Sequence, residues 1–234
     1  MTKPSTQGPA DQLFAQGKAA YEKQDWTEAI RLFEQVRIEA PASPVAAEAT
    51  YLEAMSRYNQ DMFAGAAVDF RAVRRNYPSS PFASRAQYMI GESYYQISPR
   101  PELDQSYTVL AIGEYQTFLR DYPNTIPSLA DSAQKRIAEL RNKIAQKYFL
   151  SAKLYDKLDD PKSSLVYYQR VLDNFYDSPV APESQLRIAE INFDRHKLDD
   201  ARKALDAFDA KYLHDATNSQ RDRALKLRSK LPSP

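Results

Sequence analysis

The sequence predicts an all-α protein, a right-handed superhelix of five helical pairs with a long central helix and a C-terminal capping helix. Three observations support this prediction. A pattern of one small, one large and one further apolar residue recurs five times at helical spacing. A second helical pattern precedes each copy. One long segment lacks any helix breaker.

The first copy is DWTEAIRLFEQVRIEAP, residues 25–41, in which Ala29, Phe33 and Val36 share one helical face and Pro41 ends the pattern. A single apolar stripe cannot be buried by its own helix, so each copy needs a neighbouring helix. The small residue that opens each copy lies at Ala29, Ala66, Ala111, Ser164 and Ala201.

The helix before each of the first three copies carries a small residue four positions ahead of a tyrosine. These pairs are Gly17 and Tyr21, Ala54 and Tyr58, and Gly91 and Tyr95. The small residue permits close approach of a neighbouring helix, and the aromatic ring fills space one turn later. Each unit is therefore a helical pair of about 34 residues, the length of a tetratricopeptide repeat. Proline-containing segments such as YPSSP separate the units.

Three segments depart from regular repetition. The polar stretch SPRPELDQS, residues 98–106, lengthens the connection inside the third pair. Residues 128–158 carry an apolar stripe without Gly or Pro, which predicts one continuous helix far longer than the mean of about 11–12 residues. Residues 218–231, with Ala224, Leu227 and Leu231 on one side, predict a solvating end-cap.

These segments divide the chain into four parts. We expect a disordered N-terminal segment over residues 1–9 and three repeats that form a peptide-binding half over 10–125. The long helix and repeats four and five form a partner-docking half over 126–217, and a capping helix and tail follow over 218–234.

Composition narrows the functional classes. The 234 residues carry 32 basic and 31 acidic side chains, a net charge of +1, which argues against nucleic acid as the main partner. No apolar run approaches the roughly 18–20 residues that span a bilayer, and residues 1–12 are too polar for a signal-peptide core. The absence of cysteine excludes disulfides, thiolate metal sites and a cysteine nucleophile.

One tract resembles a known family. Residues 122–157, YPNTIPSLADSAQKRIAELRNKIAQKYFLSAKLYDK, follow the insertion in the third repeat and look like the corresponding segment of the BamD (YfiO or ComL) family. The resemblance extends from about residue 10 to about residue 215. Its strength lies in the order of five repeats, insertion and long helix rather than in any single motif.

This resemblance implies a non-enzymatic scaffold of the outer-membrane β-barrel assembly machinery, at the periplasmic face of the outer membrane. It would bind the periplasmic domains of the barrel-inserting subunit and C-terminal signals of unfolded outer-membrane proteins, with other assembly lipoproteins as further partners. Members of this family are anchored by a lipidated N-terminal cysteine. This chain has no cysteine, so we expect membrane contact only through a lipid that the chain itself lacks.

The helical periodicity predicts a peptide groove along the leading helices of the first three units. Aromatic rings at successive positions could stack on an extended peptide, while phenol groups bond its backbone and a cation holds its carboxylate. The candidate residues are Phe14, Lys18, Tyr21, Tyr51, Met55, Tyr58, Arg85, Tyr88, Glu92 and Tyr95.

The second half has a more charged lining, which fits a folded protein partner better than an apolar peptide. Besides Leu186, Glu190 and Phe193, the candidate docking residues are Phe149, Lys153, Arg187, Arg195, Asp199 and Arg202.

The sequence gives little support to an enzyme. His196 and His214 have no neighbouring ligand set, and the glycines form no phosphate loop. The pairs Asp159–Asp160 and Asp199–Asp200 fall where two helices turn, so we expect them to cap the second helix. We therefore expect no catalytic residue, metal site or cofactor. Two other binding classes remain open: an envelope coordinator resembling YbgF/CpoB and a cytosolic peptide adaptor.

Overall fold

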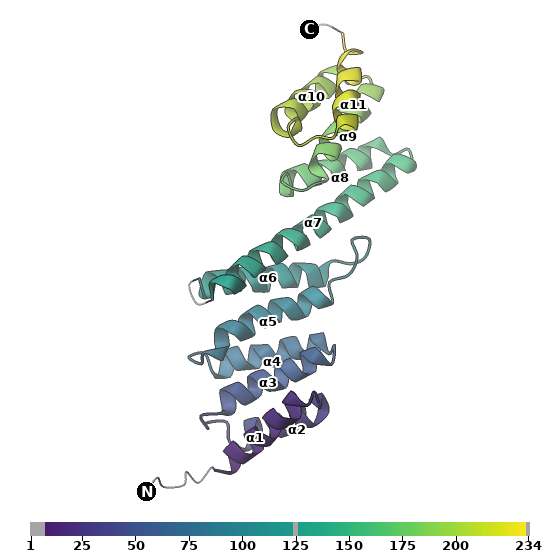
Figure 1. The fold of residues 1–234 in the computed structure, drawn as a ribbon. Helices are drawn as coiled ribbons and strands as arrows, with labels where there is room; N and C mark the ends of the chain where they lie inside the picture. Colours follow the sequence, from purple (N-terminus) through teal and green to yellow (C-terminus); the bar gives the residue numbers. More distant parts are fainter. Residues whose placement is uncertain (1–7, 124–125, 233–234) are drawn as a thin grey trace. The chain divides into compact units, whose positions relative to one another are not determined.

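The structure is a computed structural model that describes residues 8–123 and 126–232. Its described residues form eleven helices and no strand (Figure 1). The helices are α1 (Pro9–Glu22), α2 (Trp26–Glu39), α3 (Ala46–Asn59), α4 (Phe63–Asn76), α5 (Phe82–Gln96), α6 (Ser106–Asp121), α7 (Pro127–Lys157), α8 (Pro161–Asn174), α9 (Ala181–Asp194), α10 (Leu198–Tyr212) and α11 (Asn218–Arg228). The expected all-α class of five helical pairs, long helix and terminal helix is confirmed. Of the expected disordered segment, residues 1–7 lie outside the described residues, and α1 begins at Pro9.

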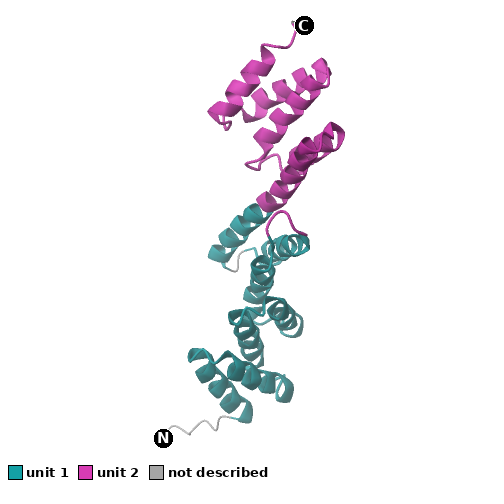
Figure 2. Ribbon diagram, turned by 90° about the vertical axis from the view of Figure 1, so that its right-hand side faces the viewer, with its two compact units in different colours: residues 1–99, 105–140 teal, residues 100–104, 141–234 magenta. Residues whose placement is uncertain are grey.

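The chain divides into two compact units, and the division falls within α7 (Figure 2). Unit 1 comprises residues 1–99 and 105–140, and unit 2 comprises residues 100–104 and 141–234. The sequence placed the boundary at residue 126 instead. The difference arises because Ala133 and Leu140, on the first part of α7, are buried in the same core as Phe70 and Phe118 of unit 1.

The repeated small–large–apolar residues form the cores. Phe33 and Phe70 of unit 1 are fully buried, and so are Tyr168 and Phe208 of unit 2. The predicted close approach is present at two glycines. A Cβ atom at Gly17 would lie 2.7 Å from a ring carbon of Phe33, and one at Gly91 would lie 2.8 Å from the Tyr115 ring. No larger residue fits at either position without displacing the ring behind it.

The same turn joins the helices in four of the five pairs. Its central residue adopts a left-handed conformation, with φ between 54° and 60°. These residues are Gln24, Asp61, Asp159 and His196. In the turn at His196, the next amide, of Lys197, donates to the carbonyl of Asn192 at 2.9 Å. His196 itself donates to the carbonyl of Phe193 at 2.9 Å, which completes a Schellman motif. Only the third pair, with its polar insertion, uses a different connection.

Aspartates cap some of the second helices but not all. Asp25 accepts from the amide of Glu28 at 3.3 Å, and Asp160 accepts from the amide of Ser163 at 3.1 Å. The expected capping by Asp199 and Asp200 is wrong. Lys197 occupies the N-cap of α10 and makes no side-chain hydrogen bond there. Both aspartates lie in the first helical turn, where their negative charge interacts favourably with the positive end of the helix dipole.

Candidate peptide and partner sites

Three tyrosines mark the same place on successive leading helices of unit 1. Tyr21, Tyr58 and Tyr95 follow one another at intervals of thirty-seven residues, and each is partly exposed. We call the surface that carries them the tyrosine face. Each of the three rings packs on a neighbour at the turn or on the next leading helix. Tyr21 meets Trp26 edge-on with ring centroids 5.1 Å apart, and Tyr58 meets Phe63 in the same way at 5.0 Å.

The hydroxyls of the tyrosine face each reach the next leading helix. Asn59 Nδ2 donates to the Tyr21 hydroxyl at 3.4 Å, and Gln96 Nε2 donates to the Tyr58 hydroxyl at 3.0 Å. The Tyr95 hydroxyl instead donates to Glu139 Oε2 at 2.9 Å. The Tyr21 and Tyr58 hydroxyls act here as acceptors, so each O–H can still donate to a ligand. The Tyr95 O–H already donates within the protein.

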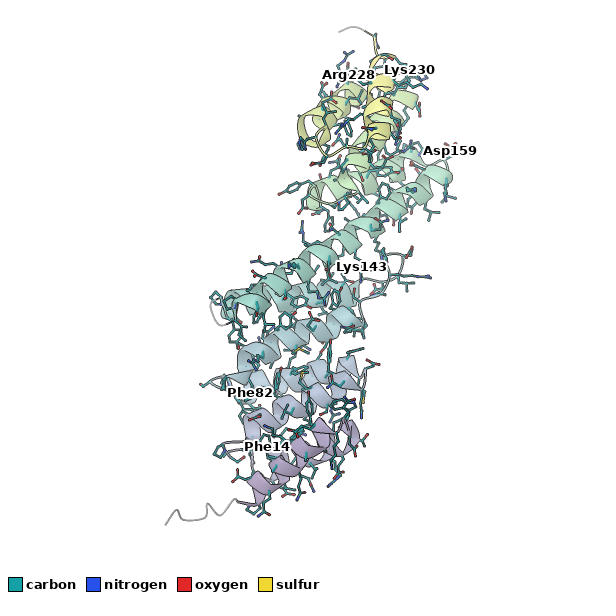
Figure 3. All side chains as sticks on the ribbon, viewed as in Figure 1. Phe14, Phe82, Lys143, Asp159, Arg228 and Lys230 are labelled. Atoms are coloured by element: carbon teal, nitrogen blue, oxygen red, sulfur yellow. The ribbon has the colours of Figure 1, made fainter. Side chains whose placement is uncertain are left out.

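Tyr51 and Arg85 lie together beside this face. The Tyr51 ring packs between Phe70 and Phe82, at centroid distances of 5.6 and 5.3 Å. Burial raises the pKa of the Tyr51 phenol, and the nearby Arg85 guanidinium partly opposes that rise. Arg85 is exposed and lines a pocket of about 380 Å³ with Tyr122 and with Phe82, which is labelled in Figure 3. Met55 is partly buried against the same core.

Two aromatic candidates for the peptide groove are core residues rather than exposed groove residues. Phe14, near the N-terminal end of unit 1 in Figure 3, is buried against Phe33, with ring centroids 5.9 Å apart. Tyr88 is buried between Tyr115 and Phe118, both at 5.6 Å. Their positions lie one turn before the small residue of each leading helix, where the second helix covers the side chain.

Two of the three charged candidates on the leading helices, Lys18 and Glu92, already have partners. Lys18 Nζ lies 3.3 Å from Glu48 and 5.5 Å from the centre of the Phe14 ring. Glu92 is buried, and its Oε1 accepts from Tyr115 at 2.6 Å, from Tyr88 at 2.8 Å and from Arg136 at 3.2 Å. Glu92 is therefore a structural acceptor within unit 1.

Arg136 of α7 belongs to this surface although the sequence reasoning missed it. Its guanidinium carbon lies 3.9 Å from the centre of the Tyr95 ring, and it also bonds Glu139 at 3.1 Å. A lone arginine in a long helix gives little signal, because its partner Glu92 lies forty-four residues away.

The docking candidates of unit 2 fall into separate groups. Lys153 lies 5.7 Å from the centre of the Phe149 ring, one turn earlier on α7. Arg187 bonds Asp156 at 3.0 Å and Glu190 at 2.6 Å. Arg195 lines a pocket of about 250 Å³ that also includes Asp156 and Arg187.

The two candidates on α10 stand apart from these groups. Asp199 is exposed in the first turn of the helix, and Arg202 donates to the Pro232 carbonyl at 2.6 Å. Of the lining residues, Leu186 is buried in the core, Glu190 is paired with Arg187, and Phe193 packs partly buried against the core.

A second aromatic cluster of unit 2 was not singled out from the sequence. Tyr155 and Tyr167 stack at 5.3 Å with an interplanar angle of 14°, and Tyr148 packs on Tyr167 at 6.4 Å. The exposed Arg170 guanidinium lies over Tyr167 at 5.3 Å and over Tyr148 at 5.9 Å. We call these four residues the Arg170 cluster. Tyrosine and arginine are the residue types that dominate protein interfaces.

The described part of the chain holds no group of three or more His, Cys, Asp or Glu side chains placed to bind a metal ion. Within those same residues, no helix combines the length and apolarity that crossing a membrane requires.

Comparison with known proteins identifies one family. Residues 6–207 match the family model of YfiO, described as outer membrane lipoprotein. No curated protein sequence matches the chain. Solved structures of similar fold include a thermophilic tetratricopeptide repeat protein of Thermus thermophilus, at 17% identity and a TM-score of 0.39, covering 94% of this chain and 99% of that one. The TPR2AB domain of yeast Sti1, in a complex with pHSP90, shows 15% identity and a TM-score of 0.44, covering 95% of this chain and 98% of that one.

Proposed function

The chain belongs to the YfiO family of outer membrane lipoproteins, and from this premise we propose that it is a scaffold of the outer-membrane β-barrel assembly machinery. Unit 1 binds C-terminal signals of unfolded outer-membrane proteins, and unit 2 binds the periplasmic domains of the barrel-inserting subunit. The broader assignment follows from the family: a non-enzymatic protein-interaction scaffold at the cell envelope.

The observation that supports peptide binding is that two hydroxyls of the tyrosine face accept hydrogen bonds and leave their O–H donors unused. Tyr21 and Tyr58 accept from Asn59 and Gln96, so each phenol proton can be donated to a peptide carbonyl. The interval of one repeat between them suits a ligand that runs along the leading helices in extended form. Burial raises the pKa of the Tyr58 phenol above its ordinary value of 10.0, so its proton is available for donation at neutral pH.

The end of such a peptide is expected beside Arg85. The exposed guanidinium can hold a terminal carboxylate, a charge-assisted contact with bidentate geometry. The pocket of about 380 Å³ that Arg85 lines with Phe82 and Tyr122 offers an aromatic surface to a terminal aromatic side chain. Lys18, the other proposed carboxylate ligand, is less suited because Glu48 already neutralises it.

The observation that supports docking in unit 2 is the composition of the Arg170 cluster. Rings of Tyr148, Tyr155 and Tyr167 hold one another in place, so little side-chain entropy is lost when a partner covers them. Arg170 remains exposed above them and can pair with a carboxylate of the partner.

Peptide binding is tested with the double variant Tyr21→Phe, Tyr58→Phe and a peptide that ends in phenylalanine. Each change removes one hydroxyl and keeps the ring, so affinity should fall by roughly fivefold per lost bond while thermal melting stays close to that of the native chain. Trp26, the single tryptophan, packs on Tyr21 and reports binding through its fluorescence. Tyr107→Phe, on the exposed side of α6, is the matched control. Equal affinity of the double variant and this control would refute the groove assignment.

Docking is tested by pull-down of the barrel-inserting subunit's periplasmic domains with Arg170→Glu and Arg195→Glu. Loss of capture with Arg170→Glu alone supports the Arg170 cluster, and loss with Arg195→Glu alone supports the docking residues predicted from the sequence. Full capture by both variants would show that unit 2 docks elsewhere or that this subunit is not the partner.

A further inference from the structure

Three of the four turns that connect successive pairs contain a Ser-Pro step, at Ser43, Ser80 and Ser178. At the first of them, a residue from the end of the following pair returns to the turn. At the first such turn, which contains Ser43 and Pro44, the returning residue is Tyr77. Its hydroxyl donates to the carbonyl of Pro41 at 3.1 Å. The protein thus contains an internal example of a tyrosine that binds the carbonyl of a proline in an extended turn.

Tyr212, the equivalent tyrosine of the fifth pair, has no proline carbonyl at the corresponding position of its turn. Tyr212 is the last residue of α10 and Tyr77 directly follows α4, each eleven residues after the small residue of its repeat. The position of Pro41 is occupied by Tyr176, whose side chain is 65% exposed. No hydrogen bond from the Tyr212 hydroxyl is present among the described residues. A pocket of about 820 Å³ lies here instead, between the turn at residues 176–179 and the end of α10.

The uncommitted polar groups of this pocket are hydroxyls. Ser178 Oγ is buried without a hydrogen-bond partner, in a residue that is 4% exposed, and it lines the pocket with Tyr176 and Tyr212. Ser43 at the first turn is also without a partner, whereas Ser80 at the second turn accepts from the amide of Phe82 at 3.2 Å. Hydroxyls donate readily to carbonyls, and an unbonded buried hydroxyl is costly enough to favour a ligand that accepts from it.

The pocket lining combines prolines and aromatic rings with charged side chains. Pro179 and Pro182 line the pocket together with the aromatic rings of Tyr176 and Tyr212, a set of side chains that can pack against pyrrolidine rings. The charged residues of the lining are two carboxylates, Asp177 and Asp215, and one ammonium group, that of Lys211. The side chains of Asp177 and Asp215 are 58% and 76% exposed, although Arg141 and His214 lie beside them. A ligand that combines proline with a basic side chain matches this surface.

We propose that this pocket of unit 2 binds an extended, proline-containing segment of a partner protein that carries a basic residue next to the prolines. The Tyr212 and Ser178 hydroxyls donate to two of its carbonyls, as Tyr77 donates to Pro41. Proline residues present carbonyls without N–H groups, so the Tyr212 and Ser178 hydroxyls can each bond a proline carbonyl while no proline N–H needs an acceptor. The exposed Asp215 carboxylate attracts the basic residue, whereas Asp177 is already paired with Arg141.

The test is fluorescence anisotropy of the full chain with a fluorescein-labelled peptide of six prolines flanked by arginine. Saturable binding is expected, and it should weaken about fivefold or more when alanine replaces the prolines or glutamate replaces arginine. Tyr212→Phe removes one hydroxyl from a nearly isosteric ring and should weaken binding about fivefold. Tyr176→Ala, at an exposed position, should weaken it without affecting folding.

Tyr77→Phe is the matched control, because it deletes a tyrosine hydroxyl at the first turn, where that hydroxyl already donates to the Pro41 carbonyl. This variant should bind the peptide as the native chain does. The proposal is overturned if the alanine peptide binds as well as the proline peptide. It is also overturned if neither Tyr212→Phe nor Tyr176→Ala weakens binding. Photocrosslinking from a benzoylphenylalanine in the peptide gives a second readout: crosslinks within residues 176–215 are expected, and crosslinks confined to unit 1 would contradict the site.

Discussion

The Tyr115 hydroxyl donates to Glu92 Oε1 at 2.6 Å, from the second helix of the third pair to its first. The fourth pair contains the same relationship between Tyr168 and Asp156, at 2.7 Å. The first two pairs have phenylalanine at this position and no acid to meet it. The change from phenylalanine to tyrosine therefore accompanies a carboxylate on the leading helix, so that a ring needed for packing also satisfies a buried charge.

Tyr115→Phe should lower the free energy of unfolding by about 2 kcal/mol, since Glu92 loses a charge-assisted bond in a buried position. Chemical denaturation with urea measures the change. Tyr107→Phe deletes a hydroxyl from a half-exposed tyrosine and should leave stability unchanged. Equal stability of the two variants would mean that Glu92 is satisfied by Tyr88 and Arg136 alone.

Gly91→Ala should destabilise unit 1 by about 1–3 kcal/mol, because its Cβ would lie 2.8 Å from the Tyr115 ring in a packed core. Gly113→Ala is the matched control, since nothing lies within 4 Å of the position that its Cβ would occupy and alanine favours a helix interior. That control should gain about 0.5–1 kcal/mol. Thermal melts of the two variants that shift in the same direction would contradict the close approach of α5 and α6.

His196→Gly should raise stability by about 1 kcal/mol, because glycine adopts the left-handed conformation at this turn without steric cost. His214→Gly is the control, as this exposed histidine does not have a positive φ, and it should gain nothing. A His196→Gly variant that melts below the native chain would show that the imidazole contributes more than its backbone conformation costs.

Asp69 should give unit 1 a distinctive pH dependence. Burial raises the pKa of its carboxyl to about 6, although Arg57 lies 2.7 Å away, and the neighbouring Glu53 adds to the rise. The folded pKa lies above the unfolded value of about 3.9. The contribution of the protonated Asp69 carboxyl to stability is therefore complete at pH values below the unfolded pKa. It is lost as pH rises towards 6 and beyond.

The native chain should therefore lose up to about 2 kcal/mol relative to Asp69→Asn between pH 4 and pH 7. Urea denaturation of both proteins across this range measures the difference. Parallel stability curves would show that the Arg57 pair holds the Asp69 pKa near its ordinary value.

The sequence predicts the repeat architecture well, because apolar periodicity reports burial directly. The helix expected over residues 128–158 is observed as Pro127–Lys157, and Gly17 and Gly91 lie at close helix contacts as the pattern requires. What the sequence could not predict is which side chain meets which across repeats. Glu92 and Arg136 are forty-four residues apart, and nothing in their local sequence pairs them.

The same limit applies to the candidate sites. Helical spacing placed Phe14 and Tyr88 on the leading helices, but whether a ring is covered depends on the angle at which the second helix packs, and both rings are buried. Tyr148 and Tyr155 lie within the apolar stripe of residues 128–158, which predicts a helix but no binding site. Their stacking with Tyr167 and Arg170 depends on the approach of α8 to α7, which periodicity does not specify.

The most direct test of peptide recognition compares two forms of one peptide that ends in phenylalanine, one with a free carboxylate and one with a C-terminal amide. Isothermal titration to the full chain should show tighter binding of the carboxylate form by about tenfold, and Arg85→Gln should remove that preference. Equal binding of both forms to the native chain, or a preference that survives in Arg85→Gln, would contradict the account.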